Sequence, residues 1–252
     1  MKNTIKNITK LFGLEIIRSS PSVHRINSNH FIPVNKNDAD WKLIKKGFSK
    51  SKNIWEDFNT NNRFYSLIQI VKYILNQKKI YNFAECGCWW GHSAYIISEM
   101  LYKHKYKGKF YIFDSFEGLS NFSKQDKYFY QKSDSDKEKM KKQFASNEKF
   151  VKDVVLKKYK FVNTYKGWIP SRFNEIKKKK FSLVHLDVDL FNPTLNSLKF
   201  FYPRLVKGGV IVCDDYNSSV FPGAKLAWDK FFVKKKYSFF LKNLLGSCFV
   251  IK

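Results

Sequence analysis

The sequence contains few of the residues that define several classes of protein. Its four cysteines are too few for a disulfide-stabilised scaffold of 252 residues, and they are Cys86, Cys88, Cys213 and Cys248. No second Cys or His pair at zinc-ligand spacing accompanies the first two. No run approaches the roughly 18 consecutive apolar residues of a membrane span, so we expect no transmembrane helix. No long apolar stretch follows the basic N-terminus, so we expect no signal peptide and a cytoplasmic protein.

Arginine is scarce as well. Five of the 47 basic residues are Arg and 42 are Lys, against 21 acidic residues, which gives a net charge of +26. Such a charge suits a polyanionic partner such as nucleic acid, an anionic membrane or a phosphorylated substrate. We favour a biased composition as the explanation, since the chain has six Ala and 20 Asn, and nucleic-acid readers prefer Arg for bidentate contacts. An apolar fraction of 44% with 18% aromatic residues excludes a disordered chain.

The pattern of apolar residues divides the chain near residue 60. We interpret residues 1–60 as an N-terminal arm followed by a polar, irregular segment, and residues 61–252 as the folded domain. Residues 1–14 form a basic amphipathic stretch, which can lie on a membrane. We expect this arm to pack on its own domain or on a partner subunit, which leaves a homodimer open. Residues 119–150 are polar and rich in Lys, and we expect them to be mobile.

Apolar strands alternate with amphipathic helices through the second part of the chain. This alternation predicts an α/β fold with a parallel sheet that is covered on both faces. Ligands bind such sheets at the carboxyl ends of the strands. The predicted strands are 81–88, 110–114, 161–167, 181–190 and 209–214, the predicted helices are 64–75, 93–104, 194–205 and 224–233, and a hairpin closes the chain at 237–252.

Two motifs follow the first two strands. Glu85-Cys-Gly-Cys-Trp-Trp-Gly-His-Ser93 opens a helix, and its two glycines permit a tight turn and close approach of a ligand to the backbone. Its spacing differs from the G-x-G-x-x-G of dinucleotide binders, so an ordinary strand–helix turn stays an alternative. Asp114 is 23 residues beyond Gly91, a position from which a carboxylate can hold ribose hydroxyls. The alternative for Asp114 is a helix cap or turn residue.

A third cluster is acidic. His185, Asp187 and Asp189 end one strand, and Asp214 and Asp215 end the next. Residues 185, 187 and 189 of a continuous strand face the same side, and neighbouring strand ends bring these carboxylates together. Buried carboxylates repel one another and need a counter-charge. Oxygen ligands suit a hard cation, Mg²⁺ before Ca²⁺ or Mn²⁺, while capping residues balanced by lysines are the alternative.

These motifs together resemble the macrocin O-methyltransferase family, whose members use S-adenosylmethionine and a metal ion to methylate sugar hydroxyls. The resemblance runs from about residue 62 to 232. It implies a Rossmann-like class I methyltransferase fold, in which a mostly parallel seven-stranded sheet carries helices on both faces and ends in an antiparallel hairpin. The segments that carry it are ECGCWWGHS (85–93), DSFEGL (114–119), YKGWIPSRF (165–173), HLDVDLFNPTLNSLKFFYPRLVKGGVIVCDDY (185–216) and PGAKLAWDKFF (222–232).

The resemblance also implies roles for individual residues. Asp187 would be the catalytic base, with Asp189 close enough to compete for that role, and Asp187, Asp214 and Asp215 would hold Mg²⁺. The residues implied for the S-adenosylmethionine site are Glu85, Gly87, Gly91 and Ser93 at its methionine end, Asp114, Ser115 and Phe116 at its ribose and adenosine, and the nearby Trp168.

The implied activity is methylation of a sugar hydroxyl, and a nucleotide-linked sugar for a surface polysaccharide or glycan is one acceptor among free, nucleotide-linked and polymeric sugars. The alternative within enzymes is a metal-dependent O-methyltransferase of a phenolic or natural-product hydroxyl. In that related group a Lys follows the first metal Asp by three residues, whereas this chain has Leu190, and Asp215 replaces the usual Asn. Another class is a basic nucleic-acid-binding protein or RNA methyltransferase, which the scarcity of Arg disfavours.

Overall fold

A seven-stranded sheet forms the centre of the computed structural model, which describes residues 37–54, 56–243 and 246–252. The strand order is β3-β2-β1-β4-β5-β7-β6, with β1 to β5 parallel and β7 antiparallel to both β5 and β6. The predicted α/β fold and its closing hairpin are therefore confirmed. The strands are β1 (Asn82–Cys86), β2 (Phe110–Asp114), β3 (Val162–Lys166), β4 (Phe181–Leu186), β5 (Leu205–Cys213), β6 (Phe239–Lys242) and β7 (Cys248–Ile251).

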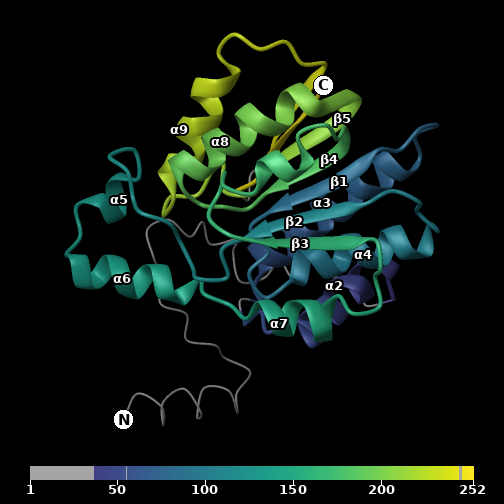
Figure 1. Cartoon of the computed structure of the whole chain (residues 1–252), viewed down its shortest axis with the longest axis horizontal. Coiled ribbons are helices and arrows are strands. Elements are labelled where there is room, and N and C mark those ends of the chain that lie inside the picture. The colour runs from purple at the N-terminus through teal and green to yellow at the C-terminus, as the bar shows by residue number, and fades with distance from the viewer. Residues whose placement is uncertain (1–36, 55, 244–245) are drawn as a thin grey trace, which may run out of the picture. The chain divides into compact units, whose positions relative to one another are not determined.

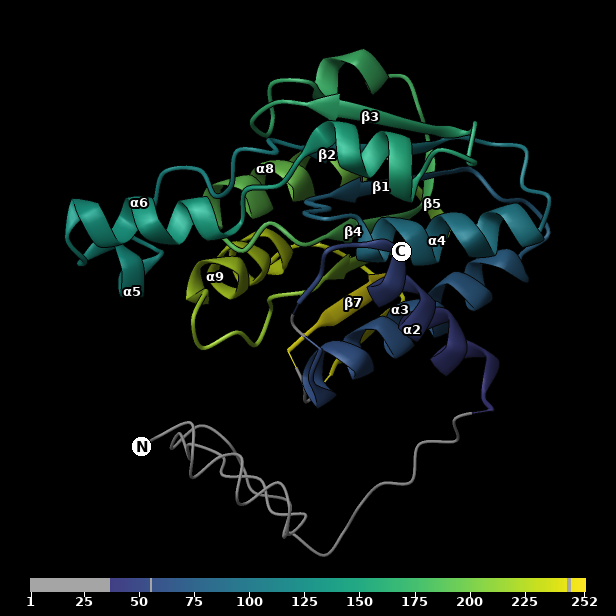
Figure 2. The same cartoon turned by 90° about the horizontal axis from the view of Figure 1, so that it is seen from below.

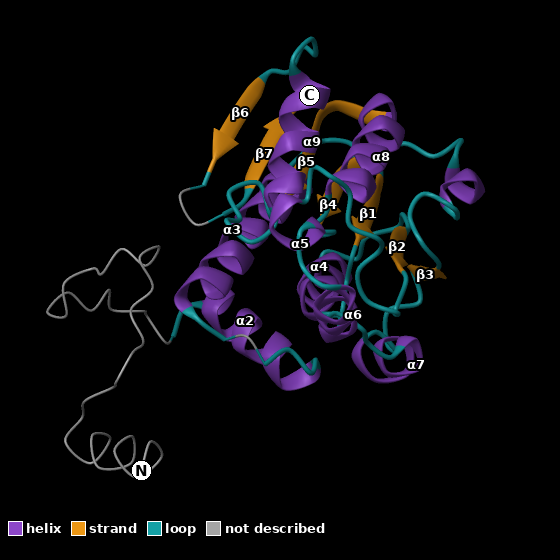
Figure 3. Ribbon diagram, turned by 90° about the vertical axis from the view of Figure 1, so that its left-hand side faces the viewer, coloured by secondary structure: helices purple, strands orange, loops and turns teal. Residues whose placement is uncertain are grey.

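Alternation along the strands builds two separate hydrophobic cores. Phe83 and Leu183 pack with helices α2, α3 and α4 on one face, whereas Ala84 and Val184 pack with α8 and α9 on the other. Figures 1 and 3 show these helices in layers on opposite faces of the sheet. The main helices are α2 (Ala39–Lys50), α3 (Phe58–Leu75), α4 (His92–Lys103), α8 (Phe191–Phe201) and α9 (Pro222–Phe232).

Helix α2 lies where the sequence predicted an irregular segment. The Asp38 side chain caps it by accepting hydrogen bonds from the backbone N–H groups of Asp40 and Trp41. Ile44 is fully buried in the core with α3 and α4, and Asp40 pairs with Lys72 of α3. The spacing of Trp41, Ile44 and Phe48 after a capping Asp is that of an amphipathic helix, so the sequence carried a helical pattern that the prediction of an irregular segment overlooked. Residues 1–36, which include the predicted amphipathic arm, lie outside the described residues.

Strand β4 is shorter than the sequence predicted. Its pairing with β1 and β5 ends at Leu186, and the left-handed backbone of Asp189 (φ +59°) turns the chain away from the sheet. The expectation that residues 185, 187 and 189 share one strand face is therefore wrong for Asp189. Helix α8 begins at Phe191 instead of residue 194, because the chain leaves the sheet early.

The Lys-rich segment after β2 also contains regular structure. It forms α5 (Lys127–Tyr130), α6 (Asp134–Gln143) and α7 (Glu148–Phe150), followed by a π-helical turn at Val151–Val155. Figures 1 and 2 show α5 and α6 beyond the end of the strands that also holds the predicted motifs. Short 3₁₀ turns lie at Phe173–Ile176 and Tyr202–Arg204. No helix among the described residues is long and apolar enough to span a bilayer.

Candidate active site

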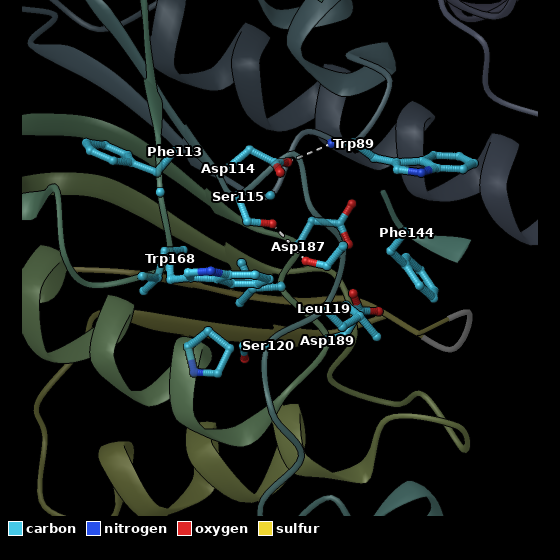
Figure 4. Close-up of a pocket in the computed structure, with 16 residues that line it drawn as sticks. Trp89, Phe113, Asp114, Ser115, Leu119, Ser120, Phe144, Trp168, Asp187 and Asp189 are labelled. Carbon is cyan, nitrogen blue, oxygen red and sulfur yellow. Dashed lines mark hydrogen bonds between the residues drawn. The ribbon is translucent and has the colours of Figure 1, made fainter. Parts of the chain in front are cut away.

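A pocket opens at the carboxyl ends of β1, β2 and β4, where the predicted motifs meet (Figure 4). The Trp168 indole extends across it from the loop after β3, and is 41% exposed. Phe144, which follows α6, lies at another side of the pocket. The predicted residues that line this pocket are Gly87, Asp114, Ser115, Trp168, Asp187 and Asp189.

Asp114 braces the loop that follows β1. One carboxylate oxygen accepts hydrogen bonds from the backbone N–H groups of Cys88 (2.7 Å) and Trp89 (2.9 Å), and the other accepts from Phe116 (2.7 Å). Burial raises the pKa of Asp114, although these three donors act in the opposite direction. The Cys88 thiol is a fourth hydrogen-bond partner of this carboxylate, so Asp114 holds the loop after β1 in place at the wall of the pocket.

Two glycines shape the same loop in different ways. Both have left-handed backbones, with φ +81° at Gly87 and +84° at Gly91. A Cβ on Gly87 would lie 1.8 Å from the carbonyl oxygen of Asp187, whereas a Cβ on Gly91 would meet the side chains of Val155 at 3.2 Å and Val151 at 3.3 Å. Gly87 therefore allows the loops after β1 and β4 to pack against each other, which the spacing of the motif did not predict.

Four residues predicted at the cofactor do not line this pocket. Glu85 is fully buried in β1 and accepts a hydrogen bond from Nδ1 of His185, its neighbour in β4, at 2.9 Å. Gly91 and Ser93 lie at the start of α4, and Phe116 packs in the core between the sheet and α4. Their roles toward a cofactor stay predictions.

The acidic cluster assembles beside the pocket. His185, Asp187 and Asp214 each offer one ligand atom, and these three atoms lie within 4.8 Å of one another. The predicted neighbours Asp187 and Asp214 thus come together. Asp215 lies outside that trio, and its carboxylate accepts the backbone N–H of Asp189 at 3.1 Å.

Arg63 of α3 supplies an internal counter-charge that the sequence did not reveal. Its guanidinium pairs with Asp214, and the four aspartates of the cluster raise the pKa of Arg63 against the effect of burial. His185 lies between Glu85 and Asp214, which outweigh burial and raise the pKa of His185 well above its usual range. Arg63 carried no motif, because it reaches the site from a helix that is distant in sequence.

These cations do not compensate all the carboxylates. Burial alone would raise the pKa of Asp214, but the positive charges of Arg63 and His185 outweigh burial, so the pKa of Asp214 lies below its ordinary value. Burial together with neighbouring aspartates raises the pKa of Asp187 and Asp189 far above the usual range, and that of Asp215 to about 6. The cluster therefore attracts further positive charge, in the form of protons or a cation.

Comparison with solved structures identifies the fold. The O-methyltransferase NovP is 17% identical, with a TM-score of 0.64 over 84% of this chain and 96% of that chain. CalS11, described as calicheamicin methyltransferase, is 14% identical, with a TM-score of 0.58 over 85% of this chain and 93% of that one. Another CalS11 structure, described as TDP-rhamnose 3′-O-methyltransferase, gives 15% identity and a TM-score of 0.50 over 83% and 93% of the two chains.

At these identities the similarity shows the fold alone, the Rossmann-like fold of class I methyltransferases. No curated protein matches the chain. The decisive match extends over most of the sequence: residues 24–247 match the family described as macrocin-O-methyltransferase (TylF), so the chain belongs to this family of O-methyltransferases.

Proposed function

We propose that this protein is an S-adenosylmethionine- and Mg²⁺-dependent O-methyltransferase whose acceptor is a sugar hydroxyl. The proposal includes a nucleotide-linked sugar as acceptor, a role in making a surface polysaccharide or glycan, and a cytoplasmic location. The observation that carries it is the buried cluster of aspartates next to the pocket, in a chain of the macrocin O-methyltransferase family.

The residues of the pocket fit a nucleoside cofactor. The Trp168 ring is exposed to the pocket and offers a flat surface on which a base can stack. The Asp114 carboxylate lines the pocket at the end of β2, where it would meet a ribose hydroxyl, and the absence of a side chain at Gly87 brings the backbone to the pocket wall. S-adenosylmethionine, when bound, supplies an electrophilic methyl group.

The cluster also fits a hard divalent cation. Asp187 and Asp214 offer carboxylate oxygens at compatible separations, and Asp215 follows directly in sequence. His185 is held between two carboxylates as a proton donor, so we assign it to positioning Asp214 and leave oxygen ligands as the donor set. A cation at these residues would neutralise them and polarise the acceptor oxygen.

Asp187 would act as the general base. It lines the pocket and belongs to the trio that could hold the cation, so an acceptor hydroxyl in the pocket would lie next to its carboxylate. Asp189 also lines the pocket, but it lies further along the turn after β4, where the backbone is left-handed. We therefore assign proton transfer from the acceptor hydroxyl to Asp187, and orientation of the acceptor to the walls of the pocket.

A panel experiment tests the acceptor class. The full chain would be incubated with methyl-labelled S-adenosylmethionine, Mg²⁺ and separate nucleotide sugars, free sugars, catechols and a small structured RNA. Labelled nucleotide sugar from the wild type, and none from Asp187→Asn, supports the proposal. Label in the catechol alone would favour a phenolic acceptor, and label in RNA alone would replace the sugar with a nucleic acid.

A further inference from the structure

The topology gathers six basic segments of the chain at one edge of the sheet. Five of them lead into parallel strands at their amino ends, and the sixth leads into β6, whose Phe239 pairs with Ile251 at the same edge. This lysine edge lies opposite the pocket, α5 and α6 (Figure 1). Its segments are residues 76–81, 104–109, 156–161, 177–180, 204–208 and 233–238.

The charge of this edge exceeds what composition explains. The six segments contain 17 Lys and Arg residues and no Asp or Glu, whereas the whole chain has 47 basic and 21 acidic residues. A uniform bias toward Lys would leave acidic residues in these segments at about half the number of basic ones. The fold therefore separates basic from acidic residues at the lysine edge and concentrates a positive potential there.

The lysines of the edge are available to a partner. All sixteen are exposed, and Lys158, which pairs with Glu99, is the one that forms an ion pair with another described residue. Backbone hydrogen bonds fix the segments next to one another, for example from Asn82 N–H to the Lys180 carbonyl and from Phe83 N–H to the Lys109 carbonyl. Seven strands at about 4.8 Å spacing spread these charges over roughly 30 Å.

Exposed apolar side chains lie among the lysines at one end of the edge. Val233, which is 75% exposed, and the exposed Tyr237 directly flank Lys234, Lys235 and Lys236, and Phe239 at the start of β6 is exposed as well. Basic residues beside exposed apolar and aromatic groups are typical of surfaces that bind at the membrane interface. On such surfaces the lysines approach the lipid headgroups, and the apolar groups enter the boundary between the headgroups and the acyl chains.

The chemistry of the edge favours lipid over nucleic acid. Arg204 is its only arginine, and that guanidinium already donates to the carbonyls of Lys177 and Phe200. Bidentate recognition of phosphates and bases by Arg is therefore unavailable here. Lysines are compact point charges, and a broad row of them matches the diffuse charge of an anionic bilayer.

We propose that the lysine edge docks this protein on a membrane surface that carries anionic phospholipids. The pocket lies at the opposite edge of the sheet, so the docked protein keeps its active site open to soluble acceptors. This inference does not depend on the proposed acceptor, because lipid binding is measured without methyl transfer.

Vesicle flotation tests the inference with the full chain. Vesicles of phosphatidylcholine with phosphatidylglycerol would be compared with vesicles of phosphatidylcholine alone. The expected result is flotation with the anionic vesicles that weakens as NaCl rises. The variant Lys234→Glu/Lys235→Glu/Lys236→Glu should reduce the partition coefficient on the order of 100-fold, at about 1 kcal/mol for each lysine.

The matched control makes the same charge change at the opposite edge. Lys124→Glu/Lys127→Glu/Lys132→Glu alters three exposed lysines at the end of the sheet that holds the pocket. This variant should reduce the partition coefficient by less than about 5-fold, which corresponds to the contribution of a single lysine. Both variants keep the basic residues 1–14, so equal flotation of wild type and the first variant would overturn the inference. A structured RNA that binds while anionic vesicles do not would also overturn it.

Discussion

Gly87→Ala tests how the two loops of the site depend on each other. The left-handed backbone costs a non-glycine residue about 1–2 kcal/mol, and Gly91→Ala incurs this same cost. At Gly87 the new Cβ would also lie 1.8 Å from the Asp187 carbonyl oxygen, so the loops must separate by at least about 1 Å. Overpacking adds about 1–3 kcal/mol, and loss of the hydrogen bond from Asp187 N–H to the Cys86 carbonyl adds about 1 kcal/mol.

Urea unfolding of the two variants measures the difference. We expect Gly91→Ala to lose about 1–2 kcal/mol of unfolding free energy, and Gly87→Ala to lose about 2–4 kcal/mol more. A Gly87→Ala protein that remains folded should also bind Mg²⁺ more weakly, because the loop that carries Asp187 has moved. Equal losses for the two variants would refute the close packing of the loops.

Three further predictions concern single side chains. Burial lowers the pKa of His92 to about 3, so this histidine takes up a proton in the unfolded state and not in the folded state as the pH falls from 7.5 to 5. The free energy of unfolding should therefore fall by about 2 kcal/mol over this range, and His92→Gln should remove that decrease. Identical pH profiles of stability for the wild type and His92→Gln would contradict this prediction. Asp114→Asn should lower the unfolding free energy by about 2–4 kcal/mol and weaken S-adenosylhomocysteine binding in calorimetry, and unchanged binding would exclude Asp114 from the cofactor site. Arg63→Gln should lower stability without metal by about 3 kcal/mol and enlarge the rise in melting temperature on adding MgCl₂; an unchanged rise would contradict a shared charge site.

The sheet could be predicted from the sequence because its central strands carry dense apolar runs, although β3 (VNTYK) does not. FYIFD at 110–114 and GVIVC at 209–213 are buried strands, and the carboxylates that follow strands mark the ligand end. Helix α2 was missed although Asp38 and the spacing of Trp41, Ile44 and Phe48 indicate a capped amphipathic helix, which contacts with α3 and α4 then stabilise.

The contacts of the site were less predictable than its residues. The motifs identified Asp114, Asp187 and Asp214, but spacing along the chain says nothing of hydrogen bonds between loops. The backbone reversal at Asp189 ends the strand earlier than its apolar pattern indicated. Arg63 reaches the cluster through the packing of α3, and a local sequence pattern does not predict a contact between residues so far apart in the chain.

The most direct test of the proposed chemistry is methyl transfer by protein from which divalent metal has been removed. After treatment with EDTA, the wild type should lose transfer from S-adenosylmethionine to a nucleotide-linked sugar and regain it when Mg²⁺ is added. Asp187→Asn should stay inactive in both conditions while still binding S-adenosylhomocysteine. Turnover that survives both EDTA and Asp187→Asn would contradict a metal-assisted reaction with Asp187 as its base.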